Sequence, residues 1–186
     1  MSATIILMSL LSLISGGGNG PGIDYSPRLL QKEVNAIFGE KEFRMTELNP
    51  ANSPVEITPA NGKFFIVRSS VGETIIVYVG RVNSCRADGC SNPLQSGMGP
   101  ESEYFDYFIL FDQDKRVRVV RVFNYAATHG QEVAVKRWLD QFAGYEPVKP
   151  LRVGKEIDAI SGATVSVYAI VADVQEKAEL LRKIKI

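Results

Sequence analysis

The strongest constraint on the fold is an apolar stripe in the last part of the sequence. Between Thr164 and Lys183, apolar residues recur three or four positions apart. This spacing predicts an amphipathic helix that must bury one face against another layer of structure. The residues of that face are Val167, Ile170, Val171, Val174, Ala178 and Leu181.

Two predicted β-hairpins supply a surface for this helix. Their strands are rich in β-branched and aromatic residues and are separated by short turn segments. Helices and antiparallel hairpins occupy different parts of the chain, which predicts an α+β class with an antiparallel sheet of hairpins packed with helices. The predicted strands are 63–68 with 73–82, and 104–111 with 116–125.

Two further helices are predicted. Ser26 and Pro27 are typical of a helix start, and Gly39 is typical of a helix end. Thr128 and Gln131 match a capping box, in which each side chain accepts a hydrogen bond from an otherwise unpaired backbone N–H of the helix start. The buried face predicted for this second helix consists of Val135, Trp138, Leu139 and Phe142, and Gly144 follows it.

Length and charge narrow the classes of function. The chain has 186 residues, which suits one domain with a sizeable core, and we expect that domain to span 23–186. It has 21 basic and 21 acidic residues, and the zero net charge argues against a nucleic-acid partner. The basic residues between 115 and 121 alternate along a predicted strand, and we interpret them as a solvated strand face.

Residues 1–22 are predicted to be a signal segment followed by a linker. Positions 5–14 are apolar apart from two serines, about half the ~20 residues that a membrane-spanning helix needs. A run of this length followed by small residues is typical of a secretory signal, although the usual preceding positive charge is missing. We therefore expect an exported protein of the periplasm or cell envelope, with no cysteine after the run to carry a lipid anchor.

The chain has two cysteines, Cys85 and Cys90. In an exported protein a disulfide that closes this short loop is the leading interpretation, while free thiols and a redox-active pair stay open. Two thiols cannot complete a zinc site, and the only histidine, His129, is distant in sequence. No metal site is predicted.

Chemistry is concentrated in the segment 158–166, where a loop of small residues runs directly into the predicted last helix. The first N–H groups of a helix are unpaired and lie at the positive end of its dipole, so they favour an anion such as phosphate. On these grounds alone, Ser161 or Thr164 acting as an ordinary helix cap would explain most of the pattern.

The string 158–164 resembles the Asp-x-x-Ser/Thr-Gly/Ser-Ala-Thr signature of FMN-binding domains whose threonine is flavinylated. This family includes the C subunit of sodium-translocating NADH:quinone reductase and the G subunit of Rnf complexes. The resemblance implies an FMN-binding-domain-like fold and makes Thr164 the acceptor onto which a flavin transferase moves FMN from FAD, as a phosphoester. Asp158, Ser161, Gly162 and Ala163 match the other motif positions, and are implied to be recognised by the transferase or to shape the loop.

A looser similarity extends over 97–174. Residues 97–100 are similar to a glycine-rich segment of the family, and residues 125–130 are similar to its Glu-Thr-Pro-Gly loop. This similarity implies that Thr128, His129 and Gly130 contact the flavin. Ala127 stands where the family favours glutamate and His129 where it favours proline, so the departures fall among the flavin contacts and not in the attachment motif.

The resemblance implies an exported electron carrier with covalent FMN, a maturing flavin transferase and a redox partner of the membrane-linked kind. The sequence shows no acid–base pair or hydrolase motif that would favour an enzyme with its own substrate. Two alternatives stay open, a non-redox module that binds a small ligand or a partner, and a flavin enzyme such as a reductase.

Four other side chains have both a functional and a structural interpretation. His129 is either a flavin contact or proton donor, or an exposed loop residue. Trp138 has the spacing of a core residue, although it could stack on a flavin. Arg152 and Lys155 are near enough in sequence to pair with a phosphate, or are solvated loop charges.

Replacement of both cysteines by serine should lower the free energy of unfolding by at most about 3 kcal/mol, because the loop they would close is short. Denaturant unfolding of the oxidised wild type and the double variant measures this change. A variant with full flavin loading and an unchanged potential would confine the pair to a structural role. An altered potential would instead favour a redox-active pair.

Overall fold

A computed structural model describes residues 22–39, 41–48, 61–86 and 102–184. The predicted signal segment and linker, apart from Gly22, lie outside these ranges, as do Cys90 and residues 97–100. The backbone of Cys85 belongs to a described strand but its side chain is not described, so the cysteine pairing stays a prediction.

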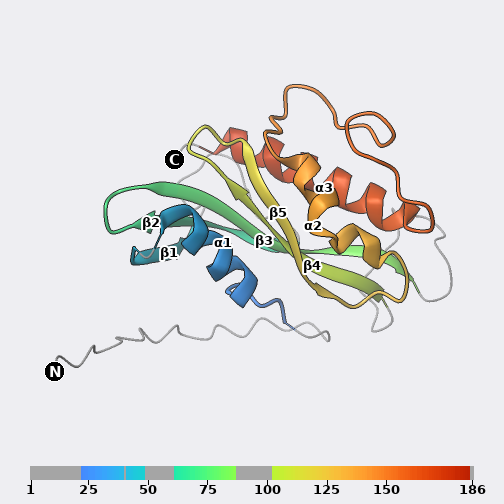
Figure 1. The fold of residues 1–186 in the computed structure, drawn as a ribbon, viewed down its shortest axis with the longest axis horizontal. Helices are drawn as coiled ribbons and strands as arrows, with labels where there is room; N and C mark the ends of the chain where they lie inside the picture. The colour runs from blue at the N-terminus through green and yellow to red at the C-terminus, as the bar shows by residue number, and fades with distance from the viewer. Residues whose placement is uncertain (1–21, 40, 49–60, 87–101, 185–186) are drawn as a thin grey trace.

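The core of the fold is a five-stranded antiparallel sheet in which each strand pairs with its neighbour in sequence (Figure 1). Val77 on the central strand lies opposite Phe65 on one side and Leu110 on the other. Both predicted hairpins and the α+β class are confirmed. In order across the sheet, the strands are β1 (Phe43–Glu47), β2 (Gly62–Ser69), β3 (Thr74–Arg86), β4 (Ser102–Phe111) and β5 (Val117–Tyr125).

Helices cover both faces of the sheet. In Figure 1 the blue α1 (Arg28–Phe38) lies on one face, and the red α3 (Thr164–Lys183) crosses the other. Three short helical segments pack on the α3 side, and they are η3 (Gln131–Ala134), α2 (Lys136–Leu139) and η4 (Asp140–Phe142).

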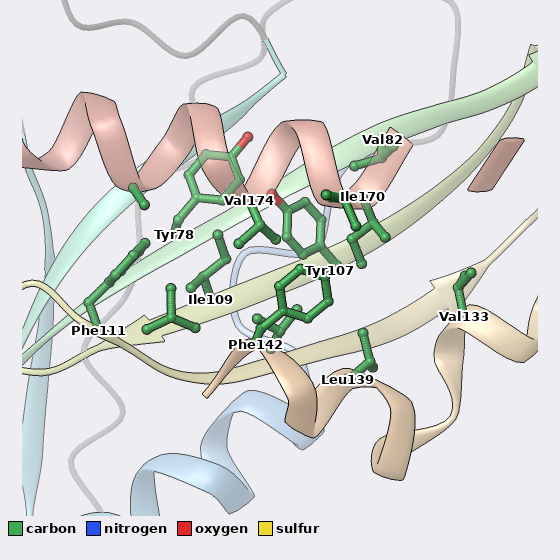
Figure 2. Close-up of a cluster of buried hydrophobic side chains, with 14 of the residues drawn as sticks. Tyr78, Val82, Tyr107, Ile109, Phe111, Val133, Leu139, Phe142, Ile170 and Val174 are labelled. Atoms are coloured by element: carbon green, nitrogen blue, oxygen red, sulfur yellow. The ribbon is translucent and has the colours of Figure 1, made fainter. Parts of the chain in front are cut away.

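The apolar stripe predicted for the last helix is buried at all six positions. It packs on sheet residues that alternate along β3 and β4, such as Tyr78, Tyr107 and Ile109 (Figure 2). Full burial of a large aliphatic side chain contributes about 1.5–3 kcal/mol, so this contact is a main source of stability. A second core on the opposite face packs α1 against the sheet.

The predicted second helix is broken, which corrects the sequence analysis. Val135 is extended (φ −67°, ψ 121°) and 53% exposed, so it interrupts the helix instead of joining its buried face. The capping box is also absent, because Gly130 stands at the N-cap of η3 with φ 85°. Trp138, Leu139 and Phe142 are buried as predicted.

Three smaller differences from the prediction concern one additional strand and the ends of two other elements. Strand β1 was not predicted, and β3 continues past its predicted end at residue 82 to Arg86. Pro27 itself takes the N-cap of α1 with extended backbone (ψ 149°), and no side chain caps that end, so Ser26 does not have its predicted role.

Arg121 was predicted to lie on a solvated strand face. This prediction is wrong, because the residue is buried and only 6% exposed. Its guanidinium binds Glu33 of α1 (Nε–Oε1 2.8 Å) and Asp140 of η4 (Nη1–Oδ1 2.9 Å). Because β5 is an edge strand, this one side chain joins the helices of both faces around the sheet edge.

A polar cluster is enclosed between α3 and the sheet. Tyr107 donates a hydrogen bond to Asp173 Oδ2, and Lys177 Nζ lies 2.9 Å from Asp173 Oδ1. Burial raises the pKa of Asp173, and the Lys177 ammonium acts in the opposite direction. The adjacent Tyr78 ring, 5.8 Å from that of Tyr107, has a buried hydroxyl with no partner in the described part of the chain (Figure 2).

Loss of the hydroxyl should affect the free energy of unfolding differently at these two buried tyrosines. Tyr107→Phe should lower the free energy of unfolding by about 1–3 kcal/mol, because Asp173 loses a buried donor. Tyr78→Phe should leave stability unchanged or raise it, because the hydroxyl that it removes has no hydrogen-bond partner among the described residues. Denaturant unfolding of the two variants tests the pair, and equal losses would contradict the described hydrogen bonding.

Candidate functional site

The last helix begins at the threonine of the motif. Thr164 is the first residue of α3 and is exposed, whereas Ala163 before it is buried. No side chain of the described residues caps this end, and the first turn holds no acidic residue. The expected cap by Ser161 or Thr164 is therefore wrong, and no described side chain accepts from the free N–H groups of the first turn.

The loop before the helix is held from beneath by apolar side chains. Ile157 is fully buried, and the backbone turns at Gly162 with φ 82°, a conformation that favours glycine. The N–H of Ala163 closes this turn by donating to Ile160 O at 3.2 Å. Ser161 in this loop and Thr164 at the helix start are both exposed.

Asp158 is clamped through its backbone. Trp138 Nε1 donates to Asp158 O at 2.9 Å, and Asp158 N donates to Gln141 Oε1 at 2.9 Å. The carboxylate is left at an exposed position. Trp138 is therefore a core residue, as its spacing predicted. Its ring packs edge-on against Phe142, and its indole N–H has a hydrogen-bond acceptor.

The loop at 128–130 lies against the first turn of α3, so the structure brings the two predicted site segments together. A Cβ placed on Gly130 would lie 2.7 Å from Ser166 Oγ, which is closer than real contacts allow. Tyr125 OH donates to His129 O at 2.6 Å, and its single hydrogen is thereby used. Ser166 Oγ, 3.2 Å away, must then donate to Tyr125 OH.

Thr128 and His129 belong to a short hydrogen-bonded chain. The hydroxyl of Thr128 donates to Glu103 Oε1, which also accepts from Thr128 N at 3.1 Å. Because that hydroxyl has one hydrogen, His129 Nδ1 (2.8 Å away) must donate to Thr128 Oγ1. In the neutral ring this leaves Nε2 as an acceptor, and Nε2 has no partner among the described residues.

Sequence reasoning missed Glu103, Gln141 and Ser166. Glu103 lies at the start of β4, 25 residues before Thr128, and meets it because β4 and β5 pair antiparallel. Only a correct strand register could have indicated that contact.

The two basic residues of the 152–156 turn take no part in this cluster. Arg152 binds Glu156 through both Nε (3.2 Å) and Nη2 (2.7 Å). That ion pair lowers the pKa of Glu156 to about 2. Lys155 is exposed, so the solvated-loop interpretation describes both side chains better than a phosphate contact does.

No protein-family model matches the chain, and no curated protein or solved structure is significantly similar to it. Within the described residues, no cluster of three or more metal-ligating side chains occurs. None of the described helices is long and apolar enough to cross a membrane.

The contact between the 128–130 loop and α3 can be tested with glycine substitutions. Gly130→Ala should lower the free energy of unfolding by more than about 2 kcal/mol, because it adds a close contact to the strain of positive φ. Gly144→Ala is the matched control, since Gly144 has φ 83° but open space around a Cβ.

The difference between the two glycine variants isolates the contact itself. We expect at least about 1 kcal/mol, partly recovered when Ser166→Ala is added to Gly130→Ala. Equal losses in the two single variants, measured by denaturant unfolding, would show that the loop does not press on α3.

Proposed function

We propose that this protein is an exported electron carrier that holds FMN through a phosphoester to Thr164. The observation that carries the proposal is the position of the motif's threonine, exposed at the first residue of a 20-residue helix whose end no described side chain caps. The motif residues, the α+β fold class and the exposed position of Thr164 all support the proposal. The FMN-binding-domain-like fold is part of the proposal.

The residues at this helix end fit the phosphate of such a group. Free N–H groups and the helix dipole attract an anion, and no acidic side chain of the first turn opposes it. Gly162 and Ala163 leave room for close approach, and a Cβ on Gly162 would meet no atom within 4 Å. The buried Ala163 and Ile157 keep the loop from moving with the attached group.

Attachment would use the Thr164 hydroxyl as the nucleophile of a flavin transferase. Its Oγ forms the phosphoester bond as the phosphoanhydride bond of FAD breaks, AMP leaves, and the hydroxyl proton passes to the transferase or to water. Asp158 and Ser161 are exposed beside the threonine, where the transferase can reach them. A covalent link suits an exported carrier, because a reversibly bound flavin would be lost where free FMN is scarce.

His129 is the residue that we assign to proton exchange. When bound, the flavin supplies one- and two-electron chemistry, and its reduction is coupled to protons. Glu103 and Thr128 orient the imidazole through Nδ1, so that Nε2 can hold or release a proton. Glu103 also brings a carboxylate to the loop in which Ala127 replaces the glutamate of the resembling family.

The location, the maturation and the redox partner that we propose follow from the resemblance to FMN-binding domains. The protein acts in the periplasm or cell envelope, is matured by a flavin transferase, and exchanges electrons with a membrane-linked partner. No described pair of groups favours a substrate of its own over electron transfer. A threonine that stays unmodified beside an active transferase would favour the non-redox binding module instead.

Variants of Thr164 separate the hydroxyl from the fold. Thr164→Ala should abolish covalent flavin while costing at most about 1 kcal/mol of stability, because the residue is exposed and caps nothing. Thr164→Ser, which keeps a hydroxyl, should retain part or all of the flavin. In-gel flavin fluorescence after denaturing electrophoresis measures attachment, and covalent flavin on Thr164→Ala would place the link elsewhere.

A further inference from the structure

One aromatic side chain is exposed beside the proposed attachment site. The sequence has nine phenylalanines, seven tyrosines and one tryptophan, and all of them lie in the described ranges. Sixteen are buried or half-buried, and the remaining one, Tyr168, is 57% exposed. Tyr168 is thus the single exposed aromatic ring of the described residues, and it lies beside the proposed attachment site.

Tyr168 lies one turn after Thr164 on the same side of α3. Residues four apart on a helix are neighbours, and helical side chains lean toward the N-terminus. The ring therefore covers the turn that begins at Thr164. Val165, 40% exposed, adds a second apolar side chain to this patch.

We propose that Tyr168, supported by Val165, is the platform on which the isoalloxazine ring of the Thr164-linked FMN stacks. This inference rests on the proposed function, because it needs the flavin at Thr164. With the phosphate at the helix end, the ribityl chain spans the axial distance of about 6 Å that separates Thr164 from Tyr168, four residues at about 1.5 Å each. A flat ring laid on the tyrosine would bury its own apolar face and the exposed patch together.

The size of the patch favours a tethered ring over a protein partner. Beyond Ala172 the outer face of α3 turns acidic at Glu176 and Glu179. The apolar part is thus confined to about two helical turns, whereas a stable protein interface buries about 1,200–2,000 Å². A planar cofactor needs only such a small area. Tyr168 would then be a positioning residue for the flavin ring.

Flavin fluorescence tests the platform, because stacking on tyrosine quenches it. The protein is prepared with its flavin transferase, and intact mass first verifies one FMN per chain in each variant. Tyr168→Ala should raise the fluorescence of the folded protein roughly two- to ten-fold, the range that loss of one aromatic pair supports, and lower its anisotropy. Tyr168→Phe should keep the quenching. Val71→Ala, at another exposed apolar residue, is the control and should change nothing.

The outcomes separate the platform from the proposed function. Full quenching in Tyr168→Ala with FMN attached would overturn the platform and leave the attachment standing. Chains without FMN in the wild type would overturn both, and the mass shows which case applies. Self-association of the flavin-free protein that Tyr168→Ala abolishes would identify the patch as an interface between copies, and would overturn the platform as well.

Discussion

The packing of α3 on the sheet determines where the candidate site lies. With Val167, Ile170 and Val174 turned into the core, the rotation of the helix about its axis is fixed, and its outer face carries Val165 and Tyr168. The same contact sets the position of the helix start, so Thr164 stands exposed at one end of the sheet. Burial of a stripe about four turns long holds that position, because moving the first turn would require repacking the core.

Two segments far apart in sequence meet at this end of the molecule. Strands β4 and β5 bring Phe105 opposite Tyr125, and their rings stack at 5.5 Å. From there the chain passes through the 128–130 loop, which presses Gly130 on Ser166 of α3. The hydrogen-bonded chain of Glu103, Thr128 and His129 therefore lies close to the helix end that we propose binds phosphate. In the function that we propose, the attachment point and the proton-exchanging group would be held by separate rigid elements.

The sequence predicted some parts of this arrangement to the residue. The bounds of α3 and its six buried positions match the prediction, because they follow from a long, regular pattern. Both hairpins are present as well, although their strand ends differ from the predicted ones, as where β3 ends at Arg86 instead of residue 82. The helix predicted after Thr128 was wrong, because the same apolar spacing suits three short turns, and Val135 breaks them where the chain bends. Glu103 and Arg121 find partners through strand register and an edge position, and neither is visible in local sequence. For that reason the position of Thr164 at the start of α3 was predictable, whereas the residues that surround it were not.

The most direct test of the central claim is the intact mass of the denatured protein, produced in an exporting host together with an active flavin transferase. We expect the mass to rise by that of FMN less one water, and we expect peptide mapping to assign the increase to the peptide that contains Thr164. An unmodified mass, obtained while the same transferase modifies a control substrate, would contradict it. The exposed threonine would then be an ordinary helix start, and the fold would be better explained as a binding module.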